Sequence, residues 1–164
     1  MISTSLEKAL NDQLNEEMFS FYLYLSMSAY LEQQNMKGMA AWMRLQAEEE
    51  YGHAMKFFAY LVDRGGAVSL EAIAKPEHTW ASPLAAFEAA LAHERHISQR
   101  IGALVDKARA ENDHATEVFL QWFVTEQVEE EATLEPIIAQ MHDTQTSKGA
   151  LYYLDRQLGK RGKE

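Results

Sequence analysis

The chain has 164 residues, with 15 lysines and arginines against 25 aspartates and glutamates, so its formal net charge is −10 at pH 7. This length predicts one domain with a sizeable core, and the absence of cysteine excludes disulfide scaffolds, thiol nucleophiles and cysteine-bound metal sites. The acidic balance disfavours nucleic acid and anionic membranes as partners and favours cations.

Long helices dominate the prediction. Residues 3–34 contain neither glycine nor proline, and their apolar side chains recur at steps of three, four or seven, which is helical spacing. One of the hydroxyl residues at the start of this stretch would cap the helix, and Glu7 would complete a capping box. After a short break, a second helix is predicted over about 38–64, and the glycine pair that follows should end it.

A long connection then separates this pair of helices from a second pair. Residues 66–82 are predicted to be irregular, and Pro83 begins a third helix that runs to about Ala110. A fourth helix follows after a tight turn and runs to about Asp143. Tight turns within each pair and a long crossover between the pairs predict an antiparallel four-helix bundle with one long crossover.

The chain is therefore predicted to be all-α and a single domain over 1–164. The bundle would span about 4–143, and a short amphipathic fifth helix would span about 147–158. We expect this fifth helix to have little to pack on within one chain, and hence to contact other subunits. No secretory signal and no apolar run of about 18–20 residues is present, so we expect a cytoplasmic protein with no membrane partner.

Each of the four long helices carries polar residues in its otherwise apolar inward stripe. Near the middle of the helices these residues are Glu17, Glu50, His53, Glu94, Gln127 and Glu130. Because middle positions of antiparallel helices share one level, the six side chains should converge. Four buried carboxylates with one imidazole cannot neutralise one another, so bound cations are expected. Oxygen ligands with one imidazole suit iron or manganese, and zinc less uniquely.

A second set of carboxylates stands one residue before three of these positions. Glu49, Glu126 and Glu129 lie about 100° round their helices from the inward stripe, on a face still near the centre. The pattern by itself leaves open whether they are ligands or parts of solvated charge runs. Glu48 and Glu131, which extend the same runs, are interpreted as solvated.

Several segments stand at the spacings of one known family. They are Glu17, the run from Glu49 to His53, Glu94, the run from Phe119 to Phe123, the run from Glu126 to Glu130, and the ending from Gly149 to Asp155. On these residues the chain resembles the bacterial non-haem ferritins over nearly its whole length. The resemblance implies iron storage in a cage of 24 identical subunits. Fe(II) would be oxidised by dioxygen or peroxide at a diiron ferroxidase centre inside each subunit, and Fe(III) would be kept as a mineral.

The resemblance also implies a role for each candidate residue. The first iron would be held by Glu17, Glu50 and His53. Glu50 would bridge to a second iron held by Glu94 and Glu130, with Gln127 beside it. A third, transient iron site would consist of Glu49, Glu126, Glu129 and Glu130. Tyr24 and Trp122 match aromatic residues near the diiron centre.

Two positions separate the chain from the related bacterioferritins, which contain haem. Those proteins have a second Glu-x-x-His on the fourth helix and a haem-binding methionine directly after the bridging glutamate. This chain has Gln127-Val128-Glu129-Glu130 and Tyr51 in those places, so no haem is expected. Pro136 lies inside the fourth helix beyond Glu130 and should kink it.

Other interpretations of the same bundle remain open. A non-storage diiron oxidase or peroxidase would use the centre as a fixed cofactor, and an acidic interaction module would only bind cations. A Dps-like mini-ferritin places its ligands between subunits, whereas one chain here supplies a complete set. Asp113, His114 and Glu117 are candidates for a pore through which cations would reach the interior.

Overall fold

The computed structural model describes residues 2–144 and 147–162, and in them it contains five α-helices and no strand. The helices are α1 (Thr4–Gln33), α2 (Lys37–Asp63), α3 (Pro83–Ala110), α4 (His114–Thr144) and α5 (Lys148–Leu158). The predicted all-α fold is confirmed, and the helix ends lie within a residue or two of the predicted ones. Pro136 lies inside α4, which continues past it to Thr144.

The beginnings of two helices follow the sequence signals closely. The Ser3 hydroxyl accepts a hydrogen bond from the amide of Leu6 at 3.0 Å, and Ser82 caps α3 in the same way, with Pro83 in the first turn. The predicted capping box at α1 is wrong in one respect. The carboxylate of Glu7 accepts its hydrogen bond from the amide of Ala67 at 3.0 Å, and so ties the end of α2 to the start of α1.

The three turns that end α1, α2 and α3 share one backbone conformation. The residues with positive φ are Asn35 (58°), Gly65 (71°) and Asn112 (56°). In each turn the next amide bonds back to the carbonyl five residues earlier, at 2.9–3.0 Å. This is the Schellman motif, which favours glycine or asparagine at the left-handed position.

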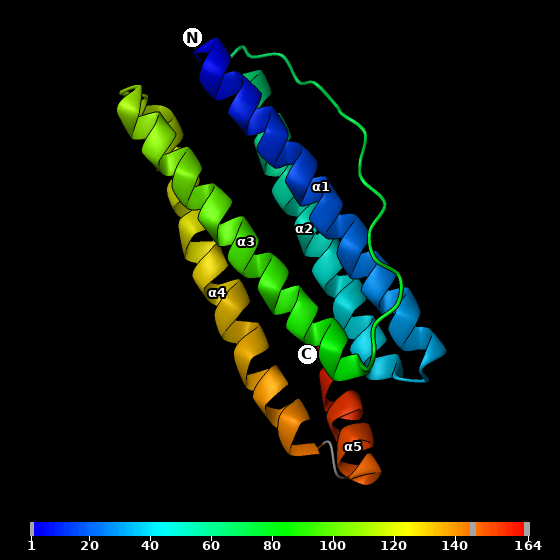
Figure 1. Ribbon diagram of the computed structural model, residues 1–164. Helices are drawn as coiled ribbons and strands as arrows, with labels where there is room; N and C mark the ends of the chain where they lie inside the picture. Colours follow the sequence, from blue (N-terminus) through cyan, green and yellow to red (C-terminus); the bar gives the residue numbers. More distant parts are fainter. Residues whose placement is uncertain (1, 145–146, 163–164) are drawn as a thin grey trace.

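The helices form two antiparallel pairs, α1 with α2 and α3 with α4, and the crossover between them runs the length of the bundle beside α1 (Figure 1). Polar side chains of α1 hold this crossover in place. Asn11 bonds the carbonyl of Ala67 and the amide of Ser69 at 2.9 and 2.7 Å, and the ring of Tyr30 lies edge-on to that of Trp80. The crossover is therefore ordered without having secondary structure of its own.

The apolar core consists of two blocks. One block packs the N-terminal half of α1 against the C-terminal halves of α2 and α3 and the N-terminal half of α4, and it includes Leu10 and Phe123. The other block fills the opposite end of the bundle and includes Met43 and Leu134. Between the blocks, all four helices contribute buried polar residues at one level. The fold thus places a polar layer across the middle of an apolar bundle.

Helix α5 turns back against the end of the bundle (Figure 1). Contrary to expectation, it has packing partners within the chain. Leu154 is buried in the core, and Asp155 accepts a hydrogen bond from the amide of Met39 at 2.8 Å. Since the N-terminus of α2 has no side-chain cap of its own, Asp155 supplies one from another helix. Tyr152 and Tyr153 stay 51% and 66% exposed.

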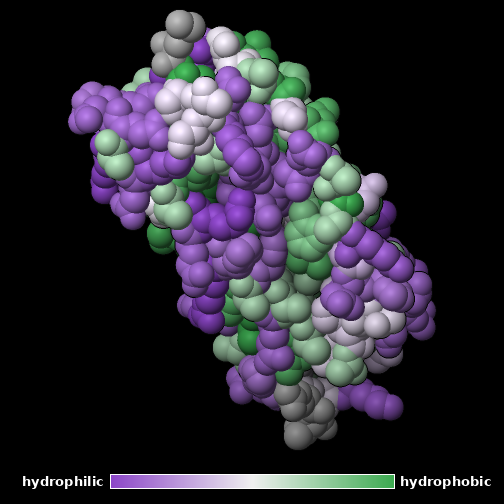
Figure 2. Space-filling view, turned by 45° about the horizontal axis from the view of Figure 1, so that its top comes forward, coloured by the Kyte–Doolittle hydropathy of each residue, from purple (hydrophilic) through white to green (hydrophobic). Residues whose placement is uncertain are grey.

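The molecular surface mixes polar and apolar side chains. Polar side chains predominate on the face seen in Figure 2, with apolar ones lying between them. Large apolar side chains that are at least 50% exposed are Val62, Leu70, Val118, Val128, Tyr152 and Tyr153. None of the helices in the described residues is long and apolar enough to cross a membrane.

Candidate metal centre

The polar layer contains the inward carboxylates and the histidine that the sequence singles out. Glu17 comes from α1, Glu50 and His53 from α2, Glu94 from α3, and Glu130 from α4. None of these five side chains is more than 6% exposed. Each occupies the position that its helix's apolar spacing turns inward, because steps of three and four residues keep one face of a helix toward the core.

Two groups of these side chains could each hold a metal ion. Glu17, Glu50 and His53 offer ligand atoms within 4.8 Å of one another, and so do Glu50, Glu94 and Glu130. Glu50 belongs to both groups, and its Oε2 lies 3.3 Å from Nδ1 of His53. The arrangement can therefore accommodate two neighbouring cations that share one carboxylate.

Of the second set of carboxylates, Glu49, Glu126 and Glu129, one lies beside this cluster. Glu126 forms a third potential group with His53 and Glu130, and its Oε1 lies 3.7 Å from Nε2 of His53. Glu49 is half-exposed and pairs with Arg161, while Glu129 is exposed. Neither of these two joins a potential metal group among the described residues. Glu48 is exposed, and Glu131 accepts a hydrogen bond from Ser98 at 2.5 Å.

Amide and phenol donors surround the carboxylates. Nε2 of Gln127 donates to Oε2 of Glu94 at 3.1 Å, and the Tyr24 hydroxyl donates to the other oxygen of Glu94. Gln13 donates to Glu17 at 2.8 Å, and Gln46 donates to Glu130 at 2.5 Å. These contacts hold the carboxylates in fixed orientations before any cation is bound.

Gln13 and Gln46 are not among the site residues predicted from the sequence, although both are fully buried. A signal was available, since Gln13 precedes Glu17 by four residues and Gln46 precedes Glu50 by four. This spacing places the two side chains of each pair on one face of a helix. A glutamine in that position next to a buried carboxylate is a natural hydrogen-bond donor.

Burial and mutual repulsion raise the pKa values of the carboxyl groups in the cluster. Burial and the neighbouring Glu50 raise the pKa of Glu17 to about 8, and burial and Glu94 raise the pKa of Glu130 to about 8. Burial and the charge of Glu94 place the pKa of Glu50 well above its ordinary value. A cation among these groups would offset both causes, because it stabilises the ionised carboxylates.

One oxygen atom of the cluster has no partner. Oε2 of Glu17 is the buried side-chain nitrogen or oxygen atom in the described residues that makes no hydrogen bond. Such an orphaned polar atom is costly in a protein interior unless something binds to it. The donor set around it, four carboxylates and one imidazole, is the chemistry that iron accepts. The residues therefore fit a bound iron ion.

Aromatic rings close one side of the cluster. The ring of His53 meets Trp122 and Phe123 edge-on, with centroids 5.4 and 6.1 Å apart. The ammonium of Lys56 lies 4.3 Å from the centroid of the Trp122 ring. This wall fixes the plane of the imidazole and limits the access of water to it.

The three candidates for a cation pore lie elsewhere, at the turn between α3 and α4. Asp113 accepts hydrogen bonds from Arg64 at 2.9–3.0 Å and from the amide of Thr116, while Glu117 pairs with Arg109. His114 is exposed. Within one chain, the two carboxylates thus have arginine partners, and Asp113 also caps α4.

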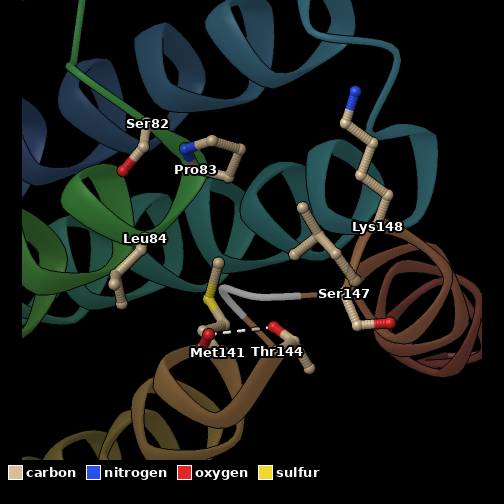
Figure 3. A pocket seen from close by; sticks show the side chains of 8 residues that line it. Ser82, Pro83, Leu84, Met141, Thr144, Ser147 and Lys148 are labelled. Carbon is tan, nitrogen blue, oxygen red and sulfur yellow. Dashed lines mark hydrogen bonds between the residues drawn. The ribbon is translucent and has the colours of Figure 1, made fainter.

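A cavity of about 360 Å³ lies at the opposite end of the bundle (Figure 3). Its walls come from the start of α3, the end of α4 and the start of α5. The lining residues are Ser82, Pro83, Leu84, Met141, Thr144, Ser147, Lys148 and Leu151. None of these is a carboxylate or a histidine, so this cavity is not a candidate metal centre.

Comparisons with known proteins identify the family of the chain. The family model of the ferritin-like domain matches residues 7–143. A bacterial non-heme ferritin of Bacteroides fragilis is 44% identical, over 98% of this chain and all of the relative, and one of Staphylococcus aureus is 37% identical, over 98% and 97%.

Solved structures of ferritins have the same fold as this chain. An open pore ferritin from the hyperthermophilic archaeon Archaeoglobus fulgidus superimposes with a TM-score of 0.97 at 46% identity, covering 98% of this chain and 99% of that one. A closed form of that ferritin, engineered by site-directed mutagenesis, gives the same TM-score and identity, covering 98% of each chain. By family, fold and the residues of its polar layer, the chain belongs to the ferritins.

Proposed function

We propose that this chain stores iron, and that it oxidises Fe(II) to Fe(III) at the carboxylate cluster inside its bundle. The observation that carries the proposal is the sharing of Glu50 between two potential metal groups, beside the orphaned oxygen of Glu17. Two Fe(II) ions would bind as substrates, the first at Glu17, Glu50 and His53. The second would bind at Glu50, Glu94 and Glu130, with Gln127 holding Glu94.

The residues of the cluster favour this reaction in three ways. Hard carboxylate ligands stabilise Fe(III) over Fe(II), so bound iron gives up an electron to dioxygen or peroxide more readily. The protons held by Glu17 and Glu130 leave when a cation arrives, because the cation lowers the pKa of these groups. The donors Tyr24 and Gln127 keep Glu94 oriented throughout.

We propose further that Glu49, Glu126 and Glu129 act with Glu130 as a third, transient iron site. The position of Glu126 supports this, since it offers a ligand atom within 4.8 Å of those of His53 and Glu130 and adds a carboxylate beside the central pair. Glu49 lies on the same side, where its charge adds to the causes that raise the pKa of Glu130. No haem is part of the proposal.

Storage requires an enclosed space, which one bundle does not provide. We propose a cage of 24 copies that keeps the ferric product as a mineral. The exposed apolar side chains support association, because Leu70, Val118 and Val128 stay 66–72% exposed in a single chain. Tyr152 and Tyr153 on α5 add a further uncovered patch.

Anaerobic loading with Fe(II) followed by an oxygen pulse tests the proposal, with absorbance and particle size recorded together. We expect ferric absorbance to grow in a large soluble particle, well beyond three iron ions per chain. The variant E50A should lose at least about tenfold in the initial rate, whereas E48A on the same helix should not.

Two other outcomes would contradict the proposal. A fixed complement of two iron ions on a small oligomer would indicate a diiron oxidase or peroxidase instead. Oxidation no faster than that of iron in buffer would leave an acidic bundle that only binds cations.

A further inference from the structure

The segment that follows α5 reaches back to the metal centre through Arg161. The guanidinium lies over the ring of Trp42, with its carbon 4.6 Å from the ring centroid. Its Nη1 donates to Oε1 of Gln46 at 2.9 Å, and its Nη2 donates to Oε2 of Glu49 at 2.6 Å. Stacking and two hydrogen bonds in different directions hold this side chain in one position.

The contact with Arg161 decides which end of the Gln46 amide faces the carboxylates. A guanidinium only donates hydrogen bonds, so the amide oxygen must point toward Arg161. The amide nitrogen therefore points inward, where it donates to Glu130 at 2.5 Å and to Glu50 at 3.4 Å. With the amide reversed, Arg161 would face a donor, and Glu130 and Glu50 would lose the amide N–H that now donates to them.

The same arrangement occurs once more on the other side of the cluster. Nε of Arg100 donates to Oε1 of Gln13 at 3.0 Å, and Nε2 of Gln13 donates to Glu17 at 2.8 Å. Both glutamines are fully buried and both arginines lie near the surface. The repetition indicates that an arginine outside the cluster and a glutamine at its edge act as a unit.

We propose that Arg161 is a positioning residue of the metal centre, acting through the amide of Gln46 on the carboxylates of Glu130 and Glu50. The inference rests on the proposed function, in which these two carboxylates bind iron. It assigns to the C-terminal segment a part in setting the affinity and geometry of a centre that lies on other helices.

Cobalt(II) provides a test that does not depend on iron oxidation, because its absorbance reports ligand geometry and it is stable in air at this kind of site. The variants are R161A, Q46M and the double variant, with K160A as the matched control. Among the described residues, the ammonium of Lys160 donates to Gln157 of its own segment, so K160A removes a neighbouring charge and leaves Arg161 and Gln46 in place. Circular dichroism and size-exclusion chromatography test whether each variant is folded and assembled.

We expect R161A to bind the most tightly held cobalt ions about tenfold more weakly than the wild type does, and with a different absorption spectrum. K160A should match the wild type in both affinity and spectrum. Because Arg161 acts through Gln46, the double variant should bind as Q46M does. If R161A does not assemble, R161K carries the test. Lysine replaces the two-nitrogen fork of the guanidinium by a single ammonium, so R161K should also bind more weakly.

Wild-type affinity and spectrum in R161A, or in R161K where R161A does not assemble, would overturn the inference. Losses that add in the double variant would overturn it as well, since Arg161 would then act without Gln46. Iron oxidation by the wild type is measured in parallel. Its failure would reject the proposed function, while the cobalt comparison would still decide the role of Arg161.

Discussion

The hydroxyl of Tyr24 in α1 donates a hydrogen bond to the carboxylate of Glu94 in α3, at the level of the polar layer. Both side chains are almost completely buried, so neither has water as an alternative partner. The bond lowers the pKa of Glu94 and opposes the raising effect of burial. Tyr24 thus links two helices and keeps a predicted iron ligand closer to its ionised form.

Replacing Tyr24 by phenylalanine should therefore weaken cation binding. Without the donor, the pKa of Glu94 rises further and a proton competes better with the metal. We expect Y24F to bind zinc about tenfold more weakly at pH 7, measured by calorimetric titration. Y22F is the matched control, because Tyr22 is exposed on the same helix. Equal affinities for Y24F and the wild type would show that the phenol has no such effect.

The metal-free protein should become less stable as the pH rises from about 5 to 8. Glu17 and Glu130 have pKa values of about 8 in the folded chain, above those of the unfolded chain, so the folded state binds more protons in this range. Unfolding then releases protons, and its free energy falls with rising pH.

The neutral variants E17Q and E130Q should each remove part of this dependence and raise the free energy of unfolding at pH 8 by about 2 kcal/mol. Chemical denaturation in the presence of a chelator measures the free energy of unfolding at each pH, and E48Q is the surface control. Saturating zinc should reverse the trend in the wild type. A stability that is flat between pH 5 and 8 without metal would contradict the assigned pKa shifts.

Asp113 makes two contributions at the turn between α3 and α4. Its carboxylate accepts a hydrogen bond from the amide of Thr116 at 3.0 Å and pairs with Arg64, which lowers the pKa of Asp113 to about 2. Because the folded pKa lies below the unfolded one, the ion pair contributes stability above about pH 4. That contribution is lost as the pH falls toward 2.

D113A should cost about 1–2 kcal/mol of unfolding free energy at pH 7, through the lost cap and the unpaired guanidinium. D113N keeps a capping side chain, so it should cost less and lose the acid dependence between pH 4 and 2. Thermal unfolding across that range distinguishes the two variants. A D113N protein as unstable as D113A would show that the cap contributes nothing.

Gly38 is required where α2 begins against α5. A Cβ atom at this position would lie 1.7 Å from the carbonyl oxygen of Asp155, a backbone atom that cannot move without displacing α5. We expect G38A to release α5 and expose the side chain of Leu154, lowering the melting temperature and speeding proteolysis of the C-terminal segment. G102A is the control, since its Cβ would meet nothing within 4 Å. In a helix that change should be neutral or stabilising.

The helices and the inward residues of the metal centre could be predicted from the sequence because both depend on local periodicity. Steps of three and four residues identify the face of a helix that is buried, and a carboxylate on that face stands out whatever its partners are. The turns at Asn35, Gly65 and Asn112 could also be predicted, because asparagine and glycine tolerate the positive φ that ends a helix, and this too is a local property. Antiparallel packing then brings mid-helix positions to one level, so Glu17, Glu50, Glu94 and Glu130 could be expected to meet.

Periodicity identifies a face but not the partner that covers it, and here the tertiary structure decided. Gln46 and Arg161 are 115 positions apart, and neither residue type in isolation predicts the other. Two other contacts also join distant segments. Glu7 accepts a hydrogen bond from the amide of Ala67 instead of completing a capping box, and Asp155 of α5 accepts one from the amide of Met39. Such contacts depend on how whole helices pack. The sequence by itself therefore determined the helices and the candidate ligands, and only the packed bundle decided which side chains hold those candidates in place.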